Sequence, residues 1–273
     1  MKNKILLVIN GESFRVGPQF SRNRESNENG IKCQFLSTLS HLRFANTIKE
    51  KYNTDCDIFL STYKISDEID KKLISWYDNF LIKSDFYDSL FGSEHEFVDQ
   101  TINQLKNLNV EKYTHIIFIR MDYFLKKYLN QKIELFDDKV MFSFFDVNHG
   151  DNTVNHGLFT TPNIYFRQLL EKGIWAYHSS YDHTIRNGMN ADCYIRSYHL
   201  CCPSGDWNPL FSYPGREECL TYPTQLYKIN NYIDIDYYKE LYSNIIGTDT
   251  IKENLEKIDI EKSIEYNLNK ITN

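Results

Sequence analysis

The segment HIIFIRMDYFLK, residues 115–126, joins an apolar run to two opposite charges. Its first residues are β-branched or aromatic, which predicts a buried strand of a parallel sheet. Residues two apart on a strand project from the same face, so Arg120 and Asp122 should lie together while Met121 points the other way. Such a pair is either an internal ion pair or part of a ligand site, because α/β sheets bind ligands beyond the carboxyl ends of their strands.

The rest of the chain supplies the neighbours of this strand. Apolar runs predict strands and helical spacing of apolar residues predicts helices, and the two kinds of element alternate. Strands are expected at 4–10, 57–62, 76–83, 115–121, 139–147 and 193–198, and helices at 35–52, 66–75, 94–108, from Pro162 onward, and at 181–189. This order predicts an α/β fold with a Rossmann-like, mainly parallel sheet flanked by helices.

The C-terminal part of the chain differs in composition. Prolines at 203, 209, 214 and 223 indicate irregular structure that closes one domain, which we expect to span residues 1–225. Residues 226–273 are rich in Asn, Ile, Lys, Asp and Glu and predict a helical extension. These helices would allow a homo-oligomer.

Composition narrows the class of protein. The chain has 41% hydrophobic and 25% charged residues, as expected of a globular protein, and a net charge of −6, which argues against nucleic acid as a partner. The apolar run after Lys4 is too short to span a membrane, so no transmembrane segment and a cytoplasmic location are expected. The six cysteines show no CxxC spacing and predict free thiols. A less favoured alternative is a zinc site formed by His199, Cys201, Cys202 and Cys219.

The loop after the first strand is the first candidate binding segment. Asn10 and Gly11 end that strand, and the arginines of the loop are Arg15, Arg22 and Arg24. Guanidinium forks suit phosphate and carboxylate oxygens, although the loop would also be an ordinary solvated one. The sequence contains neither a G-x-x-x-x-G-K-[ST] nor a G-x-G-x-x-G motif, so a nucleotide would be held in another way. Carboxylate-bound Mg²⁺ or Mn²⁺ together with these arginines is one such way.

Two further segments carry candidate chemistry. The stretch FFDVNHGDNTVNHG contains Asp146, His149, Asp151 and His156, whose polar groups suit a hydroxyl-rich ligand. In HSSYDHTIRNG, Asp182 would act as a base, with His183 beside it. Each segment also has an ordinary interpretation, because Asn, Asp and Gly form turns and Asp182 would stabilise a helix N-terminus.

The order of these motifs resembles a known family. A strand ending in Arg-x-Asp, then HGLFTTPNIYFRQLLEKG, then YDHTIRNGMNADCYI, is similar to glycosyltransferases of the surface-polysaccharide and giant-virus type with the GT-A fold. The tail segment YIDIDYYKELYSNI is similar to segments appended to many of them. The resemblance implies a GT-A-like mixed, mainly parallel sheet, a nucleotide-sugar donor, and a glycan or protein acceptor.

The resemblance also assigns roles. Asp122 falls at the metal-binding acid of the family's DXD motif, with Arg120 in place of the first acid and contacting phosphate. Asp182, or failing it Asp146, would be the catalytic base, and His149, Asp151, His156 and His183 would contact the acceptor. Mn²⁺ or Mg²⁺ is the implied cofactor, and a UDP-sugar the first choice of donor.

The sequence leaves three functions open. The favoured one is glycosyl transfer, in host cytoplasm if the source is viral. The second is a non-catalytic glycan- or nucleotide-binding protein with a degenerate glycosyltransferase fold, which Arg120 in the motif suggests. The third is a hydrolase that would use Asp146, Asp151 and Asp182.

Overall fold

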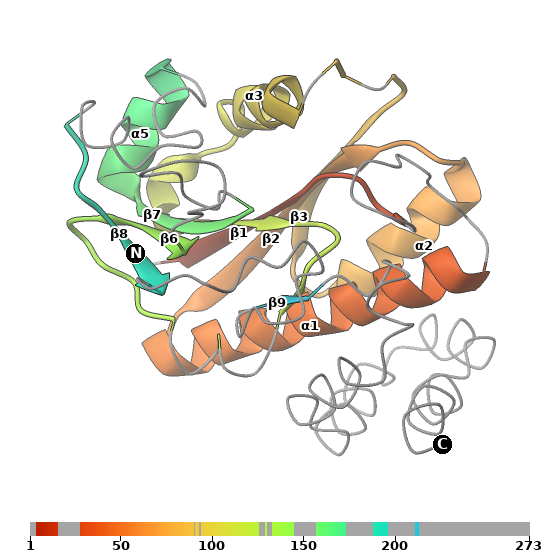
Figure 1. The fold of residues 1–273 in the computed structure, drawn as a ribbon, viewed down its shortest axis with the longest axis horizontal. Coiled ribbons are helices and arrows are strands. Elements are labelled where there is room, and N and C mark those ends of the chain that lie inside the picture. The colour runs from red at the N-terminus through yellow and green to blue at the C-terminus, as the bar shows by residue number, and fades with distance from the viewer. Residues whose placement is uncertain are drawn as a thin grey trace.

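A mixed sheet with helices on both faces forms the body of the protein, as a computed structural model shows (Figure 1). The structure describes residues 4–15, 28–89, 91–92, 94–125, 129, 133–144, 157–172, 188–195 and 211–212. The described elements are, in chain order, β1 (Lys4–Asn10), α1 (Glu28–Tyr52), β2 (Asp55–Tyr63), α2 (Asp67–Tyr77), β3 (Leu81–Tyr87), α3 (Glu94–Leu105), a 3-10 turn (Val110–Lys112), β4 (Tyr113–Arg120), β5 (Phe124–Leu125), β6 (Val140–Phe144), β7 (Leu158–Pro162), α5 (Asn163–Lys172), β8 (Ala191–Ile195) and β9 (Phe211–Ser212).

The seven-stranded sheet has the order β3-β2-β1-β4-β7-β6-β8. Strands β1, β2, β3 and β4 run parallel, and β8 is parallel to β6, whereas β7 is antiparallel to both β4 and β6. The predicted mixed, mainly parallel sheet flanked by helices is therefore confirmed. Strands β5 and β9 form a separate antiparallel pair.

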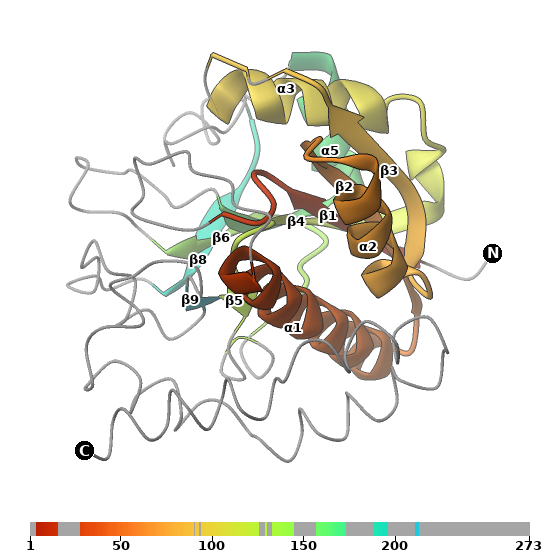
Figure 2. The ribbon, with the colours of Figure 1, turned by 90° about the vertical axis from the view of Figure 1, so that its right-hand side faces the viewer.

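Each face of the sheet has its own hydrophobic core. Helices α1 and α2 cover one face, where Leu39, Leu42 and Trp76 pack against inward-facing residues of β1 and β4. Helices α3 and α5 cover the opposite face (Figure 2), with Phe97 and Phe166 in the second core. Strands β1, β2 and β4 are buried on both faces, which explains why they read as continuous apolar runs rather than alternating ones.

One predicted strand is corrected, and one observed strand was not predicted. The expected strand at 76–83 begins only at Leu81, because Trp76 and Tyr77 complete α2 and are buried on its inner side. Strand β7 was not expected, since its five residues end in a proline and carry no clear alternation. It nevertheless pairs with β4 on one side and β6 on the other.

Other predictions agree with the structure in part. Helix α1 begins at Glu28, earlier than the expected start at residue 35. Pro162 is the last residue of β7, and helix α5 starts at the next residue. Cys56 and Cys193 are buried free thiols, as predicted. None of the described helices is long and apolar enough to cross a membrane. The expected extension at 226–273 and the boundary at 225 lie outside the described residues.

Candidate functional site

The carboxyl ends of β1 and β4 lie side by side at the point where the strand order of the sheet reverses. From β1 the chain adds β2 and β3 on one side, while β4 pairs with the other side of β1. The last residues of the two strands, Asn10 and Arg120, are register partners, and the Met121 N–H donates to the Asn10 carbonyl at 2.7 Å. Open α/β sheets bind ligands at such a switch point, so the residues that follow β1 and β4 form the candidate site.

Arg120 and Asp122 form a two-point ion pair at the end of β4. The Arg120 Nε and Nη2 atoms donate to Asp122 Oδ1 and Oδ2, each at 2.9 Å. Strand β4 ends at Arg120, and a turn closed by the Tyr123 N–H on the Arg120 carbonyl at 3.1 Å brings Asp122 back beside the guanidinium. The two side chains lie together, as predicted, although the turn and not strand spacing brings them together, and they form an ion pair.

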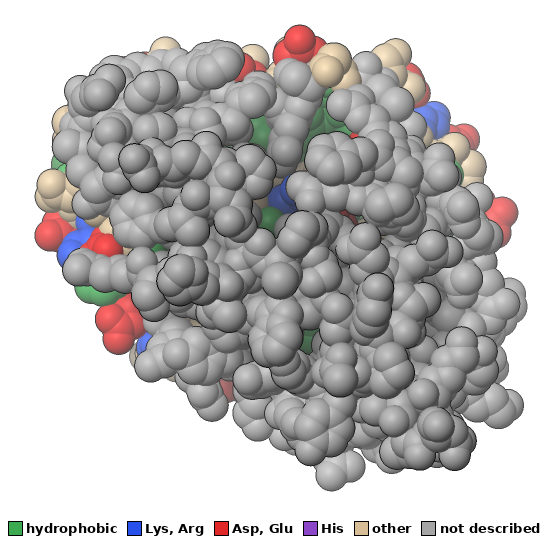
Figure 3. Space-filling view, in the orientation of Figure 1, with side chains coloured by type: hydrophobic (Ala, Val, Ile, Leu, Met, Phe, Trp, Pro, Cys, Tyr) green, Lys and Arg blue, Asp and Glu red, His purple; other side chains and the backbone are tan. Residues whose placement is uncertain are grey.

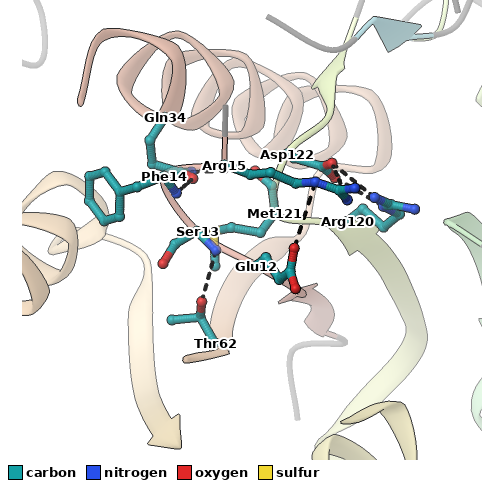
Figure 4. A network of polar contacts seen from close by, with 9 residues as sticks. All are labelled: Glu12, Ser13, Phe14, Arg15, Gln34, Thr62, Arg120, Met121 and Asp122. Carbon is teal, nitrogen blue, oxygen red and sulfur yellow. Dashed lines mark hydrogen bonds and ion pairs between the residues drawn. The ribbon is translucent and has the colours of Figure 1, made fainter. Parts of the chain in front are cut away.

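A second guanidinium approaches the same carboxylate from the loop after β1. Arg15 Nη1 lies 3.5 Å from Asp122 Oδ2, and Arg15 Nε lies 3.6 Å from Glu12 Oε2 (Figure 4). The exposed side-chain fractions of Arg15, Arg120 and Asp122 are 10%, 16% and 14%, so the group is neither fully buried nor free in solvent. In the space-filling view of Figure 3, a few blue atoms, which belong to Lys or Arg side chains, are visible near the centre. We call Glu12, Arg15, Arg120 and Asp122 the arginine–carboxylate cluster.

Gln34 of α1 holds the two loops of the cluster together. Its Oε1 accepts from the Phe14 N–H at 3.0 Å, and its Nε2 donates to the Met121 carbonyl at 3.3 Å (Figure 4). Phe14 is fully buried and has a φ of 55°, a left-handed conformation that is costly for a bulky residue. Because Phe14 precedes Arg15 and Met121 precedes Asp122, Gln34 sets the spacing between the two charged side chains.

Two glycines permit the close approach of the backbone at this edge. Gly11 has a φ of 118° and donates to the Ser61 carbonyl at 3.1 Å, which turns the chain out of β1. Gly157 accepts from the Arg120 N–H at 2.8 Å. A Cβ on Gly157 would overlap the Tyr123 hydroxyl and lie 2.7 Å from Arg120 Cδ, so only glycine fits there.

A buried histidine lies behind the turn of β4. His41 Nε2 contacts the Tyr123 carbonyl at 2.8 Å and must donate, because a carbonyl only accepts; Nδ1, 2.7 Å from the Tyr77 oxygen, then accepts from that hydroxyl. Burial lowers the pKa of His41 to about 3, although the Tyr123 carbonyl and the charge of Asp122 oppose this. The imidazole is therefore neutral and supports the turn.

The predicted site residues divide into two sets. The structure brings Asn10, Gly11, Arg15, Arg120 and Asp122 together at one edge of the sheet. The others lie outside the described residues: Arg22, Arg24, Asp146, His149, Asp151, His156, Asp182 and His183. Sequence analysis missed Gln34, His41 and Gly157. A polar residue within an apolar helical stripe is a signal that would have indicated His41.

Asp122 does not fit the role of a resident metal ligand. Both of its oxygens accept hydrogen bonds from Arg120, and Oδ2 is also close to Arg15. A divalent ion on either oxygen would lie beside two guanidinium charges. Within the described part of the chain, no group of three His, Cys, Asp or Glu side chains is arranged to hold a metal ion.

Comparisons with known proteins find distant similarities of structure. No family model matches the chain, and no curated protein matches it. Among solved structures, HddC from Yersinia pseudotuberculosis in complex with GMP-PN shares 14% identity, covering 84% of this chain and 97% of that one, with a TM-score of 0.44. A putative nucleotide-diphospho-sugar transferase from Desulfovibrio desulfuricans shares 10% identity over 72% of this chain and 81% of that one, with a TM-score of 0.43.

A third solved structure, a glycosyltransferase involved in glycosylation of the major capsid of PBCV-1, shares 10% identity over 77% of this chain and 94% of that one, with a TM-score of 0.40. All three TM-scores lie below 0.5. The description of the fold therefore rests on the order and register of the strands, and the description of the site on the contacts of the arginine–carboxylate cluster.

Proposed function

We propose that the protein is a nucleotide-sugar-dependent glycosyltransferase that uses a UDP-sugar donor and a glycan or protein hydroxyl as acceptor. One observation carries the proposal: guanidinium groups from the β1 loop and from the end of β4 meet at one carboxylate at the switch point of the sheet. An α/β sheet binds its ligand at this point, and arginine forks suit diphosphate oxygens. Among ligands that contain a diphosphate, we propose a sugar nucleotide because the order of the motifs resembles that of GT-A glycosyltransferases.

The cluster would act on the departing nucleotide. When the bond between the anomeric carbon and the diphosphate breaks, its electron pair stays with the diphosphate oxygen, which gains negative charge. Donors that already point at this oxygen stabilise the transition state without reorganising. Gln34 bonds the backbone of Phe14 and of Met121, which precede Arg15 and Asp122, and Gly157 bonds the backbone of Arg120, so the backbone that carries these side chains is anchored.

The acceptor hydroxyl must lose a proton as it attacks the anomeric carbon. Asp182, or failing it Asp146, is the base that we propose. His149, Asp151, His156 and His183 are the proposed acceptor contacts. All of these residues lie outside the described part of the chain.

Two measurements test the proposal. The first is a thermal-shift screen of UDP, GDP, dTDP and CMP, since a ligand that binds only the native state raises the unfolding temperature. The second is release of nucleotide from the matching sugar nucleotides, with Arg120→Gln as the comparison. We expect a shift with UDP and turnover of a UDP-sugar that Arg120→Gln reduces. Absence of both with every nucleotide would reject the proposal.

The same geometry would also serve a non-catalytic binding protein. This second candidate is favoured by Arg120, which stands where the DXD motif of the glycosyltransferases has its first acid. The two functions differ in turnover: a binding protein shows a thermal shift with UDP but no release of nucleotide above a control without protein, with or without acceptor glycans.

A further inference from the structure

We propose that the site binds the diphosphate of its ligand through the guanidinium groups of Arg15 and Arg120, without a divalent metal ion, and that Asp122 positions these guanidiniums. The inference rests on the proposed function, because it specifies how the same site holds the donor. It departs from the metal-binding role that the motif resemblance gives to Asp122.

The contacts of Asp122 are the first step. A carboxylate that binds Mg²⁺ or Mn²⁺ presents an oxygen lone pair to the ion at about 2.0–2.2 Å. In this protein both oxygens face guanidinium N–H groups, two at 2.9 Å and one at 3.5 Å. The two-point geometry with Arg120 is the strong, planar form of this pair. To take the lone pairs that face Arg120, a metal ion would have to displace that guanidinium.

Packing around Arg120 resists that displacement. Its guanidinium lies over the Tyr123 ring, with the Cζ atom 5.3 Å from the ring centroid. Its backbone N–H is bonded to Gly157, and its stem is so close to Gly157 that an added methyl group would lie 2.7 Å from Cδ. Arg120 would lose its contact with the Tyr123 ring as well as its two-point pair with Asp122 if it swung away.

The backbone that leads to Arg15 is anchored in the other loop. The preceding residue, Phe14, is fully buried and bonded to Gln34, and the Ser13 N–H donates to Thr62 Oγ1 at 3.1 Å. Two cations fixed on separate loops, with a carboxylate between them, offer a preformed pair of charges for an anion with two phosphate groups. In this proposal the two guanidiniums take the place of a divalent ion as the groups that contact the diphosphate oxygens.

The test is isothermal titration of the full chain with UDP and with inorganic pyrophosphate, each in EDTA and in Mn²⁺. We expect the two buffers to give dissociation constants within about threefold of each other. Loss of one charge-assisted contact weakens binding about 10- to 100-fold, which is the effect expected of Arg15→Gln and of Arg120→Gln. Arg167→Gln is the matched control, because Arg167 of α5 forms an exposed ion pair, at 3.1 Å, with Glu111 of the 3-10 turn.

The variant Asp122→Asn distinguishes the two interpretations by whether its effect on UDP binding depends on Mn²⁺. If Asp122 holds a metal, the variant loses the binding that Mn²⁺ supports. If Asp122 only positions the arginines, the variant changes the affinity for UDP by the same factor in EDTA and in Mn²⁺, because no bound metal ion is lost. Arg120→Lys keeps the charge but not the two-point contact, and its affinity should fall between wild type and Arg120→Gln. Arg120→Lys also serves as the test variant if Arg120→Gln does not fold.

The outcomes are distinguishable. UDP binding that requires Mn²⁺ and disappears in Asp122→Asn overturns the inference and leaves the proposed function standing. Metal-free binding of UDP and pyrophosphate without turnover of any sugar nucleotide supports the inference and rejects the transferase. Absence of binding of either ligand in either buffer overturns both.

Discussion

Gln34 is the residue whose replacement tests the architecture of the site most sharply. The side chain is 3% exposed and joins two buried backbone groups, the N–H of Phe14 and the carbonyl of Met121. Gln34→Leu keeps the size of the side chain and removes both hydrogen bonds. Each backbone group then stays buried without a partner, at a cost of about 1–3 kcal/mol, so the free energy of unfolding should fall by about 2–6 kcal/mol.

Gln34→Glu gives a second, pH-dependent measurement. A protonated carboxyl group has one donor and one acceptor, so it can replace both contacts of the amide, whereas the ionised form cannot donate to Met121 and is buried as a charge. The pKa of the introduced carboxyl group is then raised above its usual value of about 4.3. Stability from such a group is present at low pH and lost as the pH rises through the raised pKa. The deficit relative to wild type should therefore shrink from pH 8 to pH 5.

Urea unfolding followed by tryptophan fluorescence measures both variants. Trp76 is a suitable reporter, since its ring lies 6.1 Å from the Phe14 ring and 5.0 Å from that of Phe35. Gln168→Leu is the control: Gln168 is also helical, and its Oε1 has no hydrogen-bond partner among the described residues. A Gln34→Leu variant within about 0.5 kcal/mol of wild type would refute the role of Gln34 as the link between the loops.

Three further changes have defined outcomes. Gly157→Ala places a methyl group against Tyr123 and Arg120, so we expect a loss of about 1–3 kcal/mol in urea unfolding and weaker UDP binding by titration. Gly11→Ala, at a φ of 118°, should cost about 1–3 kcal/mol in the same assay. The pKa of His41 is lowered to about 3, so the unfolded chain binds the extra proton, and lowering the pH from 7 to 5 should remove about 2 kcal/mol of stability that His41→Gln does not lose. Equal pH dependence in His41→Gln and wild type would contradict the last expectation.

Much of the sheet could be predicted because its central strands are apolar on both faces. The prediction that Arg120 and Asp122 lie together was right about the pair but not about its cause, because β4 ends at Arg120 and a turn carries Asp122 back beside it. Strand β7 could not be predicted in the same way. Its five residues form a strand because they pair with β4 on one side and with β6 on the other. Pairing between segments that are distant in the sequence leaves no periodicity in the local sequence.

The site could be predicted only where it follows the strands. Asn10, Gly11 and Arg15 were found because Asn10 ends β1 and the other two lie in the loop that follows it. Gln34 was not found, because the apolar spacing of α1 becomes clear only after it, and its importance depends on two loops that approach from elsewhere in the chain. The pairing of Arg15 with Asp122, 107 residues away, likewise depends on the parallel register of β1 and β4.

A crystal structure of the full chain with UDP, grown in EDTA, tests the central claim most directly. We expect the diphosphate beyond the carboxyl ends of β1 and β4, with its oxygens within about 2.7–3.2 Å of guanidinium nitrogens of Arg15 and Arg120. Asp122 should still accept from Arg120 Nε and Nη2. A diphosphate bound elsewhere, or one that binds only when a metal ion on Asp122 displaces Arg120, would contradict it.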